Sequence, residues 1–95
     1  MQDDRTLLVF FTSQRSGPAR RMESLLAHIA RKERDHLDVK KVDIEARPDL
    51  AARFDVESVP ALRLVKEHRV VARLDGRVTT PAIEEMLDSY LRVVA

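Results

Sequence analysis

The sequence predicts a single α/β domain in which strands and helices follow the order β-α-β-α-β-β-α. Two observations predict this class. Short runs of β-branched and aromatic residues alternate with longer segments in which apolar residues recur every three or four positions. Prolines stand near the starts of the helical segments, where a missing N–H costs no helical hydrogen bond. With 95 residues, the whole chain, 1–95, has the length of one domain.

The first half of the chain is predicted to form two strands and one long helix. Residues 6–11 are short and apolar enough for a buried strand. Pro18 fits the first turn of a helix that ends near Asp35. Residues 37–44 form the second strand, because apolar and polar residues alternate there. The apolar stripe of the helix comprises Met22, Leu25, Leu26 and Ile29.

The second half is predicted to form a short helix, a β-hairpin and a last helix. Residues 48–54 form the short helix, and residues 62–65 and 70–74 form the two antiparallel strands of the hairpin. Thr80 and Pro81 begin the last helix. A right-handed crossover makes the first two strands parallel, so the four-stranded sheet is mixed. The apolar stripe of the last helix comprises Ile83, Met86, Leu87, Tyr90 and Leu91.

The composition describes a globular chain with little net charge. Apolar residues make up 44% of it and charged residues 35%. Since 17 basic and 16 acidic residues leave a net charge of +1, neither a nucleic-acid nor a membrane partner is expected. The longest apolar run, residues 7–11, is far shorter than the roughly 18 residues of a membrane span. No signal segment precedes it, so a cytoplasmic location is expected.

The absence of cysteine excludes disulfides, thiolate nucleophiles and thiolate metal ligands. Residues 35–38, DHLD, include side chains that can bind metals, but they lie in a helix-to-strand connection with no further ligand nearby. We therefore expect a solvated loop there, and neither a metal nor a cofactor.

Two short motifs give the chain a resemblance to a known family. Ser16-Gly17-Pro18-Ala19 lies between the first strand and the first helix, and Ser58-Val59-Pro60-Ala61 precedes the third strand. The chain resembles the thioredoxin family, which has Cys-Gly-Pro-Cys at the first place and a cis-proline loop at the second. The resemblance covers residues 7–91 and implies a thioredoxin-like sandwich with a cis Val59–Pro60 bond. Supporting matches are Val42-Asp43-Ile44, Pro48, Lys66 and Gly76.

The chain departs from the family at the residues that carry out its chemistry. Thiol-disulfide exchange requires an attacking thiolate, which neither the Ser16 hydroxyl nor the Ala19 methyl group provides. Phe10 stands where the family keeps a buried aspartate, so Lys41 is expected to have lost its usual partner. The resemblance and these two losses predict a domain without redox activity. A cysteine-free version of an active dithiol protein is less consistent with the change at Phe10.

The resemblance also implies an exposed sheet edge. Thioredoxins begin with an extra strand and helix that this chain lacks, so residues 37–44 should lie at the edge, where Lys40 and Lys41 discourage aggregation. Pairing of this edge with a second copy would satisfy its free backbone groups and would give a weak homodimer.

Two features of the first helix start have alternative interpretations. Ser16 is predicted to be an N-cap and not a nucleophile, because His28, His36 and His68 all map away from it. Positive charge from Arg15 and its neighbours Arg20 and Arg21 opposes the helix dipole. These arginines either point into water or hold an anion on the amides of Gly17 and Ala19.

We therefore expect a non-catalytic thioredoxin-like module that binds a protein or peptide partner or serves in assembly. The alternatives are a protein that binds glutathione or an anion at the helix start, and a redox-inactive form of a thiol-disulfide oxidoreductase. The candidate ligand-binding or peptide-binding residues are Arg15, Ser16, Gly17, Pro18, Ala19, Val59, Pro60 and Gly76.

Overall fold

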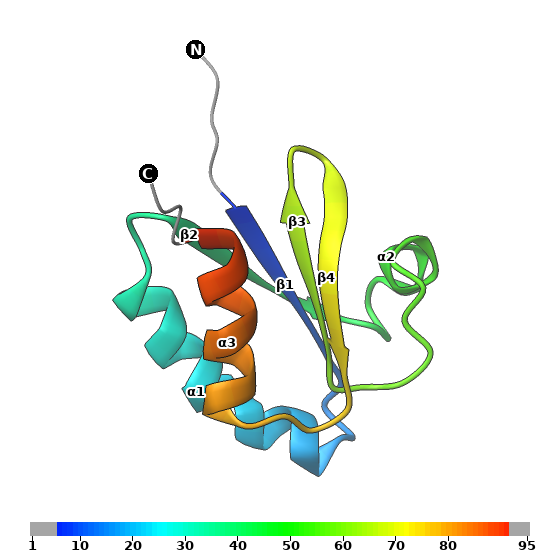
Figure 1. The fold of residues 1–95 in the computed structure, drawn as a ribbon. Coiled ribbons are helices and arrows are strands. Elements are labelled where there is room, and N and C mark those ends of the chain that lie inside the picture. Colours follow the sequence, from blue (N-terminus) through cyan, green and yellow to red (C-terminus); the bar gives the residue numbers. More distant parts are fainter. Residues whose placement is uncertain (1–5, 92–95) are drawn as a thin grey trace.

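The computed structural model describes residues 6–91 and has the predicted order of elements (Figure 1). The first and last residue of every strand lie within one residue of the predicted positions. The first helix begins one residue before Pro18 and ends three residues before Asp35. The elements are β1 (Thr6–Thr12), α1 (Gly17–Lys32), β2 (Leu37–Asp43), α2 (Pro48–Arg53), β3 (Ala61–Lys66), β4 (Arg69–Asp75) and α3 (Thr80–Leu91).

The four strands form one mixed sheet in the order β2-β1-β3-β4. Strand β1 runs parallel to β2 and antiparallel to β3, and β4 completes the hairpin with β3. The predicted parallel pairing of the first two strands and the predicted hairpin are therefore both confirmed. Strand β2 is the outermost strand on its side of the sheet, as expected for residues 37–44.

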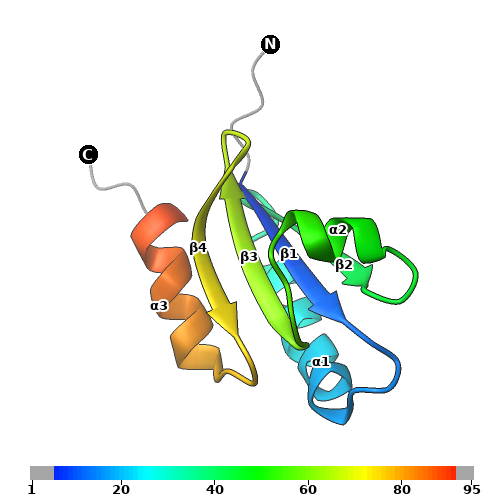
Figure 2. The same cartoon turned by 90° about the vertical axis from the view of Figure 1, so that its right-hand side faces the viewer.

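Helices cover the two faces of the sheet unequally. Figures 1 and 2 show α1 and α3 on one face and the short α2 on the other. The larger core cluster joins Leu8 and Phe10 of β1 to the predicted stripes of α1 and α3. The smaller cluster, around Val9 and Phe11, packs under α2, where the Phe11 and Phe54 rings lie 5.5 Å apart.

Side-chain caps fix the starts of the two long helices. The Ser16 hydroxyl accepts a hydrogen bond from the Ala19 N–H at 3.1 Å, so the N-cap predicted for Ser16 is confirmed. For α3, the Ala82 N–H lies 3.4 Å from Oγ1 of Thr79. The last helix begins at Thr80, as predicted, and Thr79 is the residue before it that provides this contact.

Lys41 has a carboxylate partner other than the family's aspartate, whose place Phe10 takes. Its Nζ lies 3.5 Å from Oε1 of Glu23 on α1, because β2 and α1 bring these two side chains to the same rim of the sheet. Glu23 belongs to α1 and faces this rim. The sequence argument considered only position 10 of β1 and therefore did not identify Glu23 as a partner. Lysine at this place keeps an ion pair after the family's aspartate is gone.

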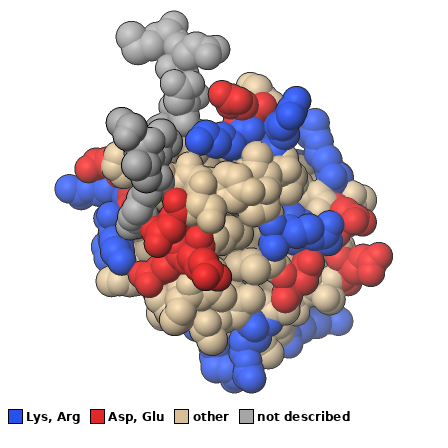
Figure 3. Space-filling model, viewed as in Figure 1, with Lys and Arg blue, Asp and Glu red and all other residues tan. Residues whose placement is uncertain are grey.

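Charges of both signs mix on the surface. On the face seen in Figure 3, basic and acidic side chains are interspersed around uncharged atoms. Within residues 6–91, no helix combines the length and apolar character that crossing a membrane requires.

Candidate functional site

Three chain segments meet at one end of the sheet. Strand register places Phe11 opposite Ala61, and Ala61 opposite Asp75. The segment that follows β1, the segment that precedes β3 and the segment that follows β4 are therefore neighbours, as Figures 1 and 2 show at the lower end of the strands. Both motifs found in the sequence lie here, together with Gly76.

The helix-start loop, residues 13–19, is held by polar contacts near the surface. The hydroxyl of Ser13 accepts from the Arg15 N–H and donates to the Glu45 carboxylate, both at 3.2 Å. Nε of Arg15 lies 3.3 Å from the same carboxylate, although 87% of the Arg15 side chain is exposed. Glu45 was not singled out in the sequence, yet it connects this loop to the end of β2.

The Ser16 hydroxyl is occupied in capping α1, and no described histidine is placed to activate it. His28 lies within α1, His36 precedes β2 and His68 is in the turn between β3 and β4. Gly17 lies under the Arg21 guanidinium, since a Cβ added to it would be 3.5 Å from Nη1 of that side chain. These contacts agree with a structural cap; the proposed anion site at Arg15, Arg20 and Arg21 stays a prediction.

The proline loop, residues 55–60, forms the other side of the site. The Val59–Pro60 peptide bond is cis, as the resemblance implied. Gly76 donates its N–H to the Pro60 carbonyl at 2.8 Å, and its φ of 83° suits glycine. Pro60 is thus joined to Gly76 by a backbone hydrogen bond, whereas the helix-start loop follows β1.

A buried arginine holds the proline loop and was missed by sequence reasoning. Arg63, on β3, is only 1% exposed. Its guanidinium donates to the carbonyl oxygens of Phe54, Asp55 and Leu62 at 3.0, 3.1 and 2.9 Å. In the sequence, Arg63 alternates with apolar residues and therefore looks like an outward position of a strand. In the structure, the end of α2 covers it and supplies its acceptors.

Arg63 also binds Asp75, at 2.9 Å between Nη1 and Oδ1. Burial raises the pKa of Asp75, but the hydrogen bond and charge of Arg63, with those of Arg73, outweigh this effect and leave the pKa below its usual range. Arg73 lies 3.3 Å from Asp75 and 3.6 Å from Asp55. Asp55, Arg73 and Asp75, with Glu57 and Ser58, line a surface cavity of about 280 Å³ beside the proline loop.

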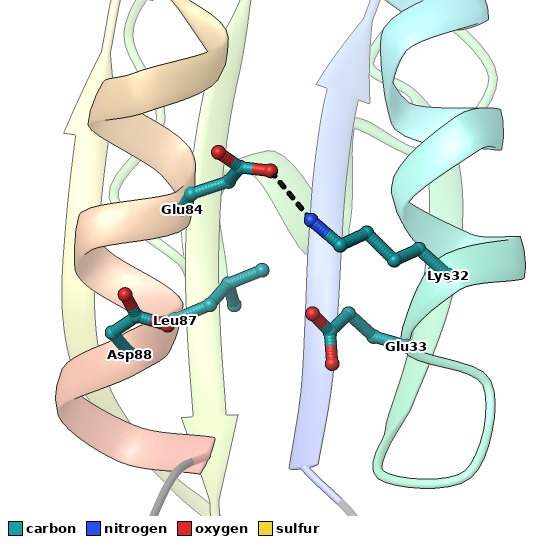
Figure 4. Close-up of a pocket in the computed structure, with 5 residues that line it drawn as sticks. All are labelled: Lys32, Glu33, Glu84, Leu87 and Asp88. Carbon is teal, nitrogen blue, oxygen red and sulfur yellow. Dashed lines mark hydrogen bonds and ion pairs between the residues drawn. The ribbon is translucent and has the colours of Figure 1, made fainter.

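A second cleft lies at the far end of α1 and does not belong to the site. Figure 4 shows Lys32 and Glu84 pointing toward one another between α1 and α3, with 2.9 Å between Nζ and Oε2. Its volume is about 150 Å³, and its lining is mostly charged. Since α1 has 16 residues at about 1.5 Å each, this cleft is roughly 24 Å along the helix from Ser16. In the described part of the chain, no three acidic or histidine side chains come together as metal ligands would.

Comparisons with known proteins agree with this arrangement. The thioredoxin family model matches residues 1–89. The chain belongs to the thioredoxin family. It is 34% identical over 87 residues to a thioredoxin-like protein of Synechocystis sp., covering 92% of this chain and 80% of that protein. It is 33% identical to Thioredoxin C-3 of Corynebacterium nephridii, covering 94% of this chain and 61% of that protein. A mutant thioredoxin from Halobacterium salinarum superposes with a TM-score of 0.87 at 26% identity, over 98% of this chain and 80% of that one.

As a member of this family, the chain lacks the group that carries out the family's reaction. No cysteine is present, so thiol-disulfide exchange by a Cys-x-x-Cys motif is impossible for it. The fold and the cis-proline loop of the family are retained, and Ser16, in the place of a cysteine, caps α1. What remains at this end of the sheet is a backbone surface flanked by charged side chains.

Proposed function

We propose that this thioredoxin-like chain is a redox-inactive binding module that takes an extended peptide segment of a protein partner along its proline loop. The peptide would pair with Val59 as an added strand and lie between the proline loop and the helix-start loop. Main-chain pairing of this kind supplies affinity without any particular chemistry in the side chains.

The free backbone of Val59 carries the proposal. Among the residues that the structure describes, neither its N–H nor its carbonyl takes part in a hydrogen bond, although the next residue, Pro60, is bound to Gly76. The same holds for the backbone of Ser58, which is exposed. Backbone groups left without internal partners are the ones that an added strand can use.

The setting of Val59 also favours binding. Its half-buried side chain packs against both core clusters, and this packing holds the backbone of Val59 in place. Arg63 holds Phe54 and Asp55, which precede the loop. A loop that is already ordered loses little conformational entropy when a ligand binds.

Peptide selection followed by NMR tests the proposal. Peptides would be selected from a random displayed library against the whole chain and titrated into ¹⁵N-labelled protein. We expect amide shifts at Ser58, Val59 and Gly76 and at residues 15–19. An analogue of the peptide with N-methylated amides loses its main-chain donors, and we expect roughly fivefold weaker binding for each hydrogen bond lost, since a hydrogen bond contributes about 1 kcal/mol.

A variant at the other end of the hairpin serves as the control. Val70 is 45% exposed and lies at the start of β4, so Val70→Asp should leave peptide affinity unchanged. Failure to select any peptide, or shifts confined to other surfaces, would contradict the proposal. Glutathione would be titrated in parallel, and shifts at Ser16 with glutathione alone would favour the small-molecule alternative. The cytoplasmic location expected from the sequence stays a prediction.

A further inference from the structure

We propose a second binding surface, independent of the proline loop: a pocket between the end of α2 and the β3–β4 turn binds an acidic segment of a protein partner. An apolar side chain of that segment would fill the pocket, and a neighbouring aspartate or glutamate would meet Arg53. The pocket, called the hairpin pocket below, has a volume of about 380 Å³. It is lined by Arg53, Phe54, Val65, His68 and Val70.

The hairpin pocket lies on the less covered face of the sheet. Among the described elements, the short α2 is the one helix on that face, and Figure 2 shows no helix in front of the β3–β4 hairpin. Val70 is 45% exposed, and it is the one large apolar side chain of residues 6–91 in the exposed class. A single exposed valine is ordinary, but this one shares a pocket with Phe54 and the half-buried Val65. A partner's apolar side chain would remove all three from water.

A β-bulge aims Val70 into this pocket. Val65 pairs with Val70, although the neighbouring pair is Leu64 with Ala72, so Val71 is an extra residue on β4. Successive residues of a strand point to opposite faces of the sheet. Without the bulge, Val71 would pair with Val65, and Val70 would point to the face that carries α3. The irregularity in β4 therefore creates the apolar part of the pocket.

The charge of the pocket indicates which partner it suits. Arg53, the last residue of α2, is exposed and makes no ion pair with any described residue, whereas Arg47 at the other end of the helix binds Asp49. His68 adds an imidazole, which can donate a hydrogen bond to a carboxylate. No acidic side chain of the described residues lines the pocket. A carboxylate of the partner would therefore gain a charge-assisted contact with Arg53.

The same charges disfavour a second copy of the chain as the occupant. Two hairpin pockets facing each other would bring together two copies of Arg53 and His68, with no carboxylate in either lining to balance them. The homodimer expected through residues 37–44 concerns another surface and stays a prediction. It would have to form without the Leu37 N–H, which already donates to the Glu33 carbonyl at 2.8 Å.

The β3–β4 turn adds a second, independent observation. Glu67 and His68 both have positive φ, 54° and 68°, in a two-residue hairpin turn of the kind that favours asparagine and glycine. Larger side chains are strained at such positions, and strain of this kind clusters at binding sites. The turn thus keeps a functional side chain, His68, at the pocket where glycine would be more stable.

The opposite wall of the pocket is fixed before any partner binds. The Arg63 guanidinium donates to the Phe54 carbonyl at 3.0 Å, and the Phe54 ring lies 5.5 Å from the ring of Phe11. A side chain that is already ordered loses little conformational entropy on binding.

Two displayed peptide libraries test the proposal on the whole chain. Both have the same length and apolar content, but one has Asp and Glu and the other Lys and Arg at the remaining positions. We expect peptides to be selected from the acidic library, and Val70→Asp and Arg53→Glu each to weaken their binding at least roughly tenfold, which corresponds to about 1.4 kcal/mol. In ¹⁵N-labelled protein, the selected peptides should shift the amides of Arg53, Phe54, Val65, His68 and Val70.

Two further variants sharpen the test. Arg69→Glu is the matched control, since Arg69 is exposed but pairs with Lys66 and so shares the other face of the sheet; affinity should stay within about twofold. His68→Gly separates binding from stability: it should raise the melting temperature, because glycine suits positive φ, and weaken the peptide. Unchanged affinity in His68→Gly would contradict the role given to the turn. Melting curves establish that each variant is folded.

The proposal is supported if the acidic library alone gives binders and both Val70→Asp and Arg53→Glu weaken them. It is overturned if neither library gives a binder, if both do so equally, or if the binders shift Ser58 and Val59 and are unaffected by Val70→Asp. Sedimentation with phosphatidylserine vesicles tests a membrane as the occupant. Vesicle binding that Val70→Asp abolishes would also overturn the proposal.

Discussion

The two loops of the candidate site are held in place by different kinds of contact. The helix-start loop depends on hydroxyls and on an ion pair at the surface, where 87% of Arg15 is exposed. The proline loop depends on Arg63, which is 1% exposed and donates to three backbone carbonyls. The helix-start loop is therefore held by contacts at the surface, and the proline loop by a buried side chain.

This difference bears on which part of the site can change. Surface hydrogen bonds and ion pairs contribute little each, so residues of the helix-start loop can be replaced without unfolding the domain. When a buried side chain that donates to backbone carbonyls is removed, those carbonyls stay buried without a donor, and the free energy of unfolding falls strongly. The family's cysteines belonged to the first kind of loop, and their replacement by Ser16 and Ala19 leaves the second loop intact.

The largest expected effect is at Arg63. Arg63→Met keeps much of the side-chain volume but leaves the carbonyls of Phe54 and Asp55 without their donor. At 1–3 kcal/mol for each buried unsatisfied group, we expect a loss of at least about 2 kcal/mol in the free energy of unfolding. Urea and thermal denaturation would measure it, and the melting temperature should fall by at least roughly 8–16 °C.

Arg73→Met is the matched control for this change. Arg73 lies directly opposite Arg63 in the β3–β4 register, but about half of its side chain is exposed. Since its ion pairs lie at the surface, the loss should stay below about 1 kcal/mol. Equal losses of stability from the two variants would show that burial does not make the contacts of Arg63 more stabilising than surface contacts. The difference drawn between the two loops would then not hold.

The next effect concerns pH and Asp75. Its pKa is lower in the folded protein than in the unfolded chain, so its contribution to stability is present above the unfolded pKa of about 3.9 and is lost as pH falls through the folded value. Asp75→Asn should flatten the acid side of the stability curve and cost less than Arg63→Met at pH 7, because half of Asp75 is exposed.

Asp49 is the control for Asp75 on the acid side of the curve of stability against pH, called the acid limb below. A hydrogen bond from Arg47 lowers its pKa, but this pair lies at the surface of α2 and touches neither loop. Asp49→Asn should therefore change the acid limb without changing the response of the protein to Arg63→Met. An unchanged acid limb in Asp75→Asn would remove Asp75 from the support of the proline loop.

The fold could be predicted from the sequence because its signals are local. Apolar periodicity and the positions of Pro18, Pro48 and Pro81 locate the helices, and strand-length apolar runs locate the sheet. The N-cap of α1 is also a local matter, and it was confirmed. Contacts between distant segments were not predictable in this way. The partners of Arg63, the pairing of Lys41 with Glu23 and the contact of Glu45 with Ser13 depend on how the loops pack over the sheet.

A smaller effect is expected at Ser16. Ser16→Ala removes the acceptor of the Ala19 N–H and should reduce the free energy of unfolding by about 1 kcal/mol. Ser89→Ala, at an exposed hydroxyl within α3, should change it by less than about 0.5 kcal/mol. Thermal denaturation measures both. A loss at Ser16 as large as the loss at Arg63 would mean that both loops are held equally firmly.

The smallest effect is expected at Arg15, and it also tests the anion hypothesis. Arg15→Ala removes an exposed ion pair with Glu45 and a positive charge that opposes the α1 dipole, so the two contributions offset and the net change should stay within about 0.5 kcal/mol. An anion at the helix start would need Arg15 to leave Glu45, and the Ser16 hydroxyl is already occupied. We therefore expect sulfate, compared with chloride at matched ionic strength, to raise the melting temperature of the parent and of Arg15→Ala, Arg20→Ala by the same amount. An increment present only in the parent would instead show that the arginines hold an anion, because binding to the folded state adds RT ln(1 + [L]/Kd) beyond the general effect of the salt.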